Sequence, residues 1–342
     1  MMQFGIFDQN DRGPYPLGEQ YENRLQLIEF YDRTGFRTYY MSEHHSTPLN
    51  LTPSPSVFLA AVAQRTQRIR LGALVYVLPA HHPLRLAEEI CMLDHLSGGR
   101  IEFGIGRGAS PHELHYFGID PDQAPAMYVE AYTVIMQALT QNEVNFSGQY
   151  YKYENVPIDL KPAQLLHPPL WYAVPVPEGA AWPAQNRINV VCGGPLPRVR
   201  EITDRYRAEW AAGRAPDQMP LLGINRFVVA ADTDREAMEL GRRAWPVFFK
   251  SFMKLWNKYG TQPRYARIPE DFDAVVKNGG GIAGSPGTIR EQVGKMAEQA
   301  GANYFISQFS FGDLTHAEVL HSAGIFAREV LPIARERVAQ AV

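Results

Sequence analysis

Cysteine is scarce in this sequence, which holds only Cys91 and Cys192 among its 342 residues and has no CxxC pair. Two distant cysteines provide neither a disulfide framework nor a thiolate metal site. A chain without disulfides suits a reducing compartment, so we expect a cytoplasmic protein.

The sequence also has no excess of charge of one sign and no long apolar run. The 33 basic and 36 acidic side chains give a formal net charge of -3 and are interspersed along the chain, so no strip of like charge marks a surface for nucleic acid or for a membrane. The longest apolar stretch, around residues 71–80, is too short to cross a bilayer. The N-terminus lacks the basic region and long apolar segment of a signal peptide. A small molecule is therefore the expected partner.

No repeat of fixed period and no linker of Pro, Ser and Gly divides the chain, so we expect one domain over residues 1–342. Short runs of β-branched and aromatic residues alternate with longer segments of helical periodicity, which is typical of a parallel sheet. The eight expected strands are Gln3–Phe7, Thr38–Met41, Ile69–Val77, Arg100–Ile105, Leu170–Val174, Ile188–Val191, Leu221–Val229 and Tyr304–Gln308. The expected helices are Glu19–Thr34, Ser56–Arg65, Pro83–Leu96, Met127–Leu139, Pro197–Ala212, Asp232–Tyr259, Thr288–Ala300 and His316–Val338. This pattern predicts an α/β fold of the (β/α)8 type, a TIM barrel.

Two segments interrupt the alternation. Residues 144–153 mix aromatic and polar side chains and predict a hairpin. Residues 260–284 are rich in glycine and predict a mobile loop.

In a barrel of this kind, reactive side chains project from the loops at the carboxyl ends of the strands. The motif Ser42-Glu43-His44-His45 directly follows the second expected strand. Histidine titrates near neutral pH, so His44 or His45 is a candidate acid or base, and Glu43 is placed to fix the tautomer. The alternative, that both histidines only hydrogen-bond to the loop backbone, fits the local sequence equally well.

A second histidine pair, His81-His82, follows the third expected strand. Four histidines in two pairs raise the question of a metal site. Adjacent side chains in extended backbone point to opposite sides, and the HEXXH pattern is absent. We therefore expect no metal.

A glycine-rich stretch, Gly104 to Gly108, follows the fourth expected strand and contains Arg107. Glycines let the backbone approach a ligand closely, and the forked donors of arginine suit a phosphate. The stretch is therefore a candidate phosphate cradle. It is not the dinucleotide fingerprint GxGxxG, because Ala109 stands where the third glycine is needed. A tight turn with Arg107 paired to a carboxylate is an equally good interpretation.

Six segments share their order and spacing with a known family. They are Ser42-Glu43-His44-His45, Val77-Leu78-Pro79 with His82-Pro83, Leu93 to Arg100, Gly104 to Gly108, Gly284 to Thr288 and Phe309 to Asp313. With these segments the chain resembles the luciferase-like monooxygenases. The resemblance is most specific over residues 1–120 and weaker in the middle of the chain.

The resemblance implies an enzyme that binds reduced flavin mononucleotide (FMN, as FMNH2) at the mouth of the barrel. Reaction with O2 would give a flavin hydroperoxide that oxygenates a small organic substrate. By the same resemblance His44 is the catalytic histidine, with His45 and Glu43 beside it. A separate flavin reductase and a homodimer are the implied protein partners.

The resemblance also implies which residues hold the flavin. A cis peptide bond between Leu74 and Val75 is expected under the flavin ring. Arg107, followed by Gly108, is expected to contact the phosphate.

The loop after the fifth expected strand departs from the family. Residues 174–181 lack the hydroxyl side chains that hold the phosphate in its members, and Pro125 replaces a second arginine. Backbone N–H groups near Val176 and Gly179 would then support Arg107. We therefore expect weak or transient flavin binding.

Two alternatives stay open. A deazaflavin (F420)-dependent oxidoreductase of the same superfamily would transfer hydride without oxygen. Its anionic cofactor tail would favour basic residues at the mouth, and the sequence suggests few beyond Arg107. A catalytically silent partner subunit would explain the altered phosphate loop, although the intact Glu43-His44-His45 motif argues against it. The organic substrate depends on variable loops and is not specified by these motifs.

Overall fold

The structure, a computed structural model, describes residues 2–211, 215, 218–263 and 267–332. Within these residues nine strands form the main sheet: β1 (Gln3–Asp8), β2 (Thr38–Met41), β3 (Arg70–Val77), β4 (Ile101–Gly106), β7 (Leu170–Ala173), β8 (Asn189–Cys192), β9 (Leu222–Ala230), β10 (Gly281–Gly284) and β11 (Tyr304–Gln308). Eight of them close into a parallel barrel in the order β9-β11-β1-β2-β3-β4-β7-β8, with β8 pairing to β9. All eight expected strands are present, and the closed barrel confirms the predicted fold.

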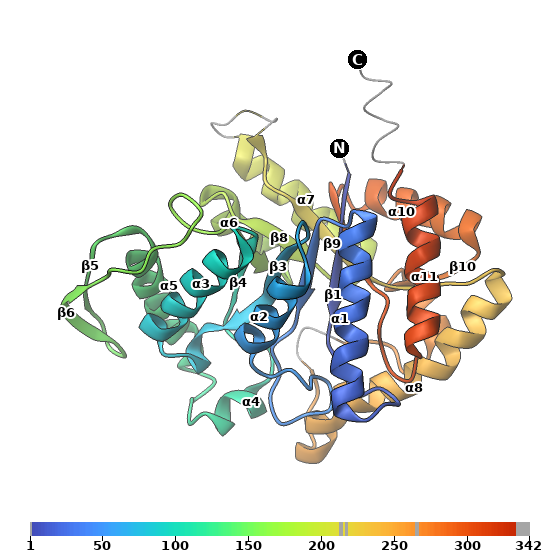
Figure 1. The fold of residues 1–342 in the computed structure, drawn as a ribbon, viewed down its shortest axis with the longest axis horizontal. Coiled ribbons are helices and arrows are strands. Elements are labelled where there is room, and N and C mark those ends of the chain that lie inside the picture. The colour runs from blue at the N-terminus through green and yellow to red at the C-terminus, as the bar shows by residue number, and fades with distance from the viewer. Residues whose placement is uncertain (1, 212–214, 216–217, 264–266, 333–342) are drawn as a thin grey trace.

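Helices cover the outside of the barrel (Figure 1). The predicted ones are α1 (Leu17–Thr34), α2 (Pro55–Arg65), α3 (Pro83–Ser97), α5 (Ala124–Thr140), α7 (Leu196–Ala211), α8 (Asp234–Tyr259), α10 (Pro286–Gln299) and α11 (His316–Glu329). Helix α3 begins at Pro83 and ends at Gly98 with a φ of 68°, because proline tolerates the first turn and glycine the left-handed cap. Helix α11 ends earlier than predicted, and residues 333–338 of that prediction lie outside the described residues. No helix in the described ranges is long and apolar enough to cross a membrane.

Several elements depart from the simple alternation. Strands β5 (Glu143–Ser147) and β6 (Lys152–Pro157) pair antiparallel where the sequence predicts a hairpin. Residues 260–284 were expected to be a loop, which is wrong in part, because they contain α9 (Phe272–Lys277) and β10. Strand β10 pairs with the carboxyl half of β9. The mobility of this segment stays a prediction.

Short elements that the sequence does not predict lie at the strand ends. They are the helices α4 (Pro111–Tyr116) and α6 (Ala181–Gln185) and the 3-10 turns η1 (Leu78–Ala80) and η2 (Pro177–Ala180). Helix α4 is essential for the site described below.

The interior of the barrel is filled by aromatic side chains around one buried carboxylate. Tyr40, Trp171 and Tyr304 pack together, and the Glu102 carboxylate accepts hydrogen bonds from the Tyr40 hydroxyl and, at 2.7 Å, from the Trp171 indole N–H. Arg70 donates to the same carboxylate at 2.7 Å. Since Glu102 is the second residue of β4, this network lies toward the amino ends of the strands, the end of a barrel that serves stability.

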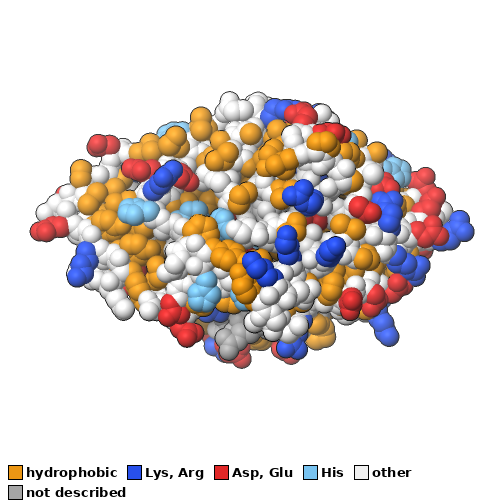
Figure 2. Space-filling view, turned by 90° about the horizontal axis from the view of Figure 1, so that it is seen from below, with side chains coloured by type: hydrophobic (Ala, Val, Ile, Leu, Met, Phe, Trp, Pro, Cys, Tyr) orange, Lys and Arg blue, Asp and Glu red, His pale blue; other side chains and the backbone are white. Residues whose placement is uncertain are grey.

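The carboxyl ends of the barrel strands meet at one face, which we call the mouth. In Figure 1 the chain enters β1 from the N-terminus at the top, and α4, which follows β4, lies at the bottom. Figure 2 looks at the molecule from this lower side and shows histidine, basic and apolar side chains gathered there. Catalytic groups of (β/α)8 enzymes are found at this end of the barrel.

Candidate active site

Glu43 is a buried carboxylate that joins two loops of the mouth. It follows β2 and accepts hydrogen bonds from the Val77 backbone N–H, the His45 ring and the His81 ring, each at 2.9 Å. Burial alone would raise the pKa of Glu43, but the hydrogen bonds from His45 and His81 outweigh it and lower the pKa to about 2. Glu43 therefore stays ionised and fixes both rings.

His44 pairs with a different carboxylate, Glu113 of α4. Its Nδ1 lies 3.1 Å from Glu113 Oε1, while Glu113 Oε2 accepts the His45 backbone N–H at 2.8 Å. Ser110 caps α4 and accepts the Glu113 backbone N–H at 3.4 Å. Burial lowers the pKa of His44, but the charge of Glu113 and its hydrogen bond outweigh burial, so the pKa is raised. With Nδ1 engaged, Nε2 is the nitrogen that can exchange a proton with a ligand.

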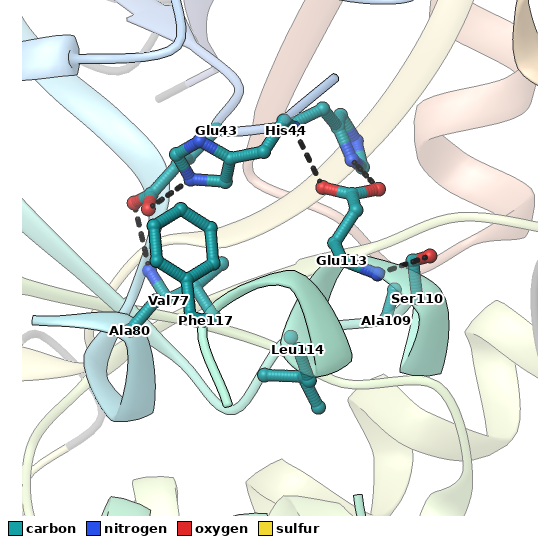
Figure 3. A pocket seen from close by; sticks show the side chains of 11 residues that line it. Glu43, His44, Val77, Ala80, Ala109, Ser110, Glu113, Leu114 and Phe117 are labelled. Atoms are coloured by element: carbon teal, nitrogen blue, oxygen red, sulfur yellow. Dashed lines mark hydrogen bonds and ion pairs between the residues drawn. The ribbon is translucent and has the colours of Figure 1, made fainter. Parts of the chain in front are cut away.

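These groups line one small pocket at the mouth. Figure 3 shows the Glu113 carboxylate reaching from α4 toward the loop of Glu43 and His44. The residues that line the pocket are Glu43, His44, His45, Val77, Ala80, Gly108, Ala109, Ser110, Glu113, Leu114 and Phe117. The pocket therefore joins the ends of β2, β3 and β4.

The two histidine pairs diverge, as extended backbone requires. His44 turns to α4 and His45 to Glu43, whereas His81 turns to Glu43 and His82 to the β5–β6 hairpin. In the part of the chain that the structure describes, no three His, Cys, Asp or Glu side chains are placed to hold a metal ion.

Strand β3 carries a bulge at the mouth. The peptide bond between Leu74 and Val75 is cis, and the pairing with β4 shifts register at this point. Both side chains are partly exposed, although the neighbouring residues of the strand are buried. A Cβ on Gly106 would lie 2.2 Å from a Val75 methyl group, so only glycine lets β4 approach the bulge.

The expected phosphate side contains Arg107 and the loop after β7. Arg107 is exposed directly after β4, and Gly108 beside it has a φ of 89°. Val176 and Gly179 are partly buried at η2. The Gly179 N–H already donates to the Val176 carbonyl at 3.0 Å. This N–H is therefore engaged within the turn, and the expectation that backbone N–H groups near Val176 and Gly179 support Arg107 stays a prediction.

Helix α8 runs to the lower side of the molecule in Figure 1, and side chains near its carboxyl end contact α4. The His112 ring stacks on Tyr259 with centroids 4.4 Å apart and meets Trp256 edge to face. The Tyr116 and Tyr259 hydroxyls are 2.9 Å apart. These contacts hold the helix that carries Glu113.

The same helix bears a row of lysines. Lys250, Lys254 and Lys258 are exposed at intervals of one turn, and the backbone between them contacts the loop after β2, since the Ser251 carbonyl accepts from Thr47 at 3.4 Å. A stretch of α8 with exposed lysines therefore lies beside the loop after β2, and the expectation of few basic residues at the mouth beyond Arg107 stays a prediction.

Residues 2–304 match the family model described as luciferase-like monooxygenase. The chain belongs to this family. Among its relatives, it is 41% identical over 331 residues to the uncharacterised protein y4wF of Sinorhizobium fredii, covering 96% of each chain. It is 32% identical to 4-hydroxyprotoasukamycin monooxygenase of Streptomyces nodosus subsp. asukaensis, covering 74% of this chain and 71% of the relative.

Several solved structures share the fold of this chain. Monooxygenase RslO1 from Streptomyces bottropensis superposes with a TM-score of 0.86 at 24% identity, covering 97% of this chain and 100% of the other. The oxygenating constituent of 3,6-diketocamphane monooxygenase from Pseudomonas putida, in complex with FMN, gives 0.80 at 22% identity over 97% and 98%. The F420-dependent tetrahydromethanopterin reductase from Methanopyrus kandleri gives 0.69 at 19% identity over 97% and 99%. Both cofactors therefore occur on this fold.

The structure groups some of the predicted site residues and separates others. Glu43, His44, His45 and Gly108 line the same pocket. Leu74, Val75, Arg107, Val176 and Gly179 are not among its lining residues, and their cofactor roles stay predictions. Sequence reasoning missed Glu113. The spacing of Ser110 and Glu113, which is that of a helix N-cap followed by an acidic residue three positions later, indicates a helix at this strand end and was the available signal.

Proposed function

We propose that this luciferase-like monooxygenase uses reduced FMN and O2 to oxygenate a small organic substrate. The observation that supports it best is the pair of His44 and Glu113 in a pocket at the mouth, beside the bulge of β3. The 32% identical relative is itself named a monooxygenase.

The residues at the mouth fit a flavin. Leu74 and Val75 offer partly exposed apolar surface for a flat ring, and the glycine at 106 lets the two strands close up beneath it. Arg107 provides a cation for the phosphate at the end of the neighbouring strand. Ring and phosphate contacts therefore come from adjacent strands.

When bound, reduced flavin supplies the two electrons that split O2, so that one oxygen atom enters the substrate and the other leaves as water. The chain supplies proton control. Glu113 holds His44 through Nδ1 and favours its protonated form, so His44 can donate a proton from Nε2 and take one back. Glu43 fixes His45 and His81 around the pocket, which keeps this wall rigid.

The first test is equilibrium binding under anaerobic conditions. Purified protein is titrated with photoreduced FMN, oxidised FMN and F420, with Arg107→Ala as the control variant. We expect tighter binding of reduced FMN than of oxidised FMN, and a loss of this affinity in Arg107→Ala. Absence of binding to any of the three would contradict the proposal and leave the silent partner subunit as the better interpretation.

A second candidate is hydride transfer with F420. The row of Lys250, Lys254 and Lys258 favours it, because exposed cations near the mouth suit a long anionic cofactor tail. Selective binding of F420 in the same titration, weakened by Lys254→Gln, would support this candidate over the monooxygenase.

The proposed monooxygenase needs two protein contacts. A separate reductase would supply the reduced flavin, and adding a purified flavin reductase with NADH should make O2 uptake depend on the organic substrate. A homodimer through outer helices is supported by Val57 on α2 and Met92 on α3, which are 73% and 54% exposed apolar side chains on packed helices. Sedimentation of the purified protein at a single protomer mass would contradict the dimer.

A further inference from the structure

One hydroxyl near the expected phosphate site lacks a partner. The Tyr128 Oη on α5 is buried and makes no hydrogen bond within the described residues. A buried hydroxyl without a hydrogen-bond partner destabilises the folded protein. Such groups call for an explanation, and a ligand that is bound during function is one.

Tyr128 lies over the carboxyl ends of β4 and β7. Arg107 follows β4, and the loop that begins at residue 174 follows β7. Its ring centroid is 6.4 Å from that of Tyr172 on β7, and Tyr172 pairs in register with Ile105 of β4. Arg107 is two residues beyond Ile105, and the loop that begins at residue 174 is two residues beyond Tyr172. Parallel strands in register therefore bring Arg107 and this loop together beneath Tyr128.

Helix geometry directs the Tyr128 side chain toward Pro125, where this chain lacks the second arginine of the family. A long side chain on a helix leans toward the N-terminal turn and covers the surface above the residues before it. For Tyr128 that surface includes Pro125, which is exposed and has no side-chain donor. Tyr128 thus provides a polar group on the face where residue 125 provides none.

The hydroxyl is suited to donate to an anion. Burial and the neighbouring Tyr172 raise the pKa of Tyr128, while the charge of Arg107 opposes them. The phenol therefore stays protonated at neutral pH, and the guanidinium is close enough to act on it electrostatically. A protonated phenol beside a guanidinium is a donor set for phosphate oxygens.

We propose that the Tyr128 hydroxyl, together with Arg107, binds the phosphate of FMN and replaces the hydroxyl side chains that residues 174–181 lack. Tyr128 as a whole is partly exposed although its hydroxyl is buried, so binding would require its side chain to rotate toward the ligand. This assignment rests on the proposed function, since it requires a flavin that ends in a phosphate.

The test compares FMN with riboflavin, which has the same ring and no phosphate. Dissociation constants of both are measured by fluorescence titration for the wild type, Tyr128→Phe and Tyr132→Phe. Tyr132 is the matched control, because it stacks on Tyr128 one turn along α5 with centroids 6.5 Å apart, and its hydroxyl is not among the buried unpartnered atoms. We expect Tyr128→Phe to weaken FMN binding about tenfold, to leave riboflavin binding unchanged and to leave the urea midpoint of the flavin-free protein no lower. Tyr132→Phe should change neither affinity.

The outcomes separate the two proposals. If the wild type binds FMN more tightly than riboflavin and Tyr128→Phe keeps that ratio, the Tyr128 assignment is wrong and the proposed function stands. If Tyr128→Phe weakens both flavins equally, the residue supports the ring or the fold, and the assignment is wrong as well. If the wild type binds neither flavin, both proposals fail.

Discussion

Replacing Glu43 by glutamine should measure how strongly one buried carboxylate holds the wall of the pocket. Its side chain is 0% exposed and accepts three hydrogen bonds. A pKa lowered from 4.5 to about 2 corresponds to roughly 3 kcal/mol of stability for the ionised form at neutral pH. Glutamine keeps the size and one acceptor oxygen but loses the charge. We therefore expect Glu43→Gln to reduce the free energy of unfolding at pH 7 by roughly 3 kcal/mol.

The pH dependence gives this prediction its sign. A carboxylate with a lowered pKa stabilises the folded protein above its unfolded value of 4.5, and the contribution is lost as pH falls toward 2. The difference between wild type and Glu43→Gln should therefore shrink as pH drops below 4.5. Urea unfolding followed by tryptophan fluorescence, at steps from pH 7 to pH 3.5, measures it. Glu239→Gln, on an exposed side chain 3.9 Å from Arg235, is the control and should change stability little. A difference that is below about 1 kcal/mol at pH 7, or constant with pH, would refute the reasoning.

Further predictions concern the pKa of His44, the binding of the FMN phosphate and the close packing of the backbone at Gly104. Glu113→Gln should lower the pKa of His44 and shift the basic limb of the pH profile for O2-dependent oxidation of bound reduced FMN to lower pH; an unshifted profile would count against the pairing. His44→Ala should slow substrate oxygenation about a hundredfold while reduced FMN still binds, and equal loss of binding would indicate a structural role instead. Arg107→Ala should weaken FMN about tenfold or more and riboflavin little in the same titration. Gly104→Ala should destabilise the fold by about 2–3 kcal/mol in urea, because its Cβ would lie 2.1 Å from the Ala73 carbonyl oxygen, whereas Gly294→Ala in α10 meets nothing within 4 Å and should be neutral or stabilising.

The barrel could be predicted from the sequence because its strands are short, apolar and separated by helical periodicity. The runs Thr38–Met41 and Tyr304–Gln308 are fully buried, and each consists mostly of aromatic and apolar residues, which is typical of a buried strand. Strand β10 was missed because Gly281–Gly284 contains two glycines and has too few side chains to show a pattern. Helix α9 was missed because it is only 6 residues long and is followed directly by the glycines at 279–281.

The site could be predicted only as far as local motifs reach. The position of His44 after β2 follows from the strand pattern, but its partner Glu113 is 69 residues away in sequence and depends on how α4 folds back. The use of the Gly179 N–H within its own turn depends on a 3-10 conformation that loop composition does not specify. Lys250, Lys254 and Lys258 fall within the helix predicted over Asp232–Tyr259, whereas the contact of this helix with the loop after β2 depends on the direction in which α8 runs.

The contact between α4 and α8 has an evolutionary consequence. Because His112 and Tyr116 rest on Tyr259, a substitution at this end of α8 also changes the support of Glu113, and through it the pKa of His44. In the proposed reaction, a change at this end of α8 would therefore also retune proton transfer by His44. Adaptation at this helix should proceed by paired substitutions, one on each side of the contact.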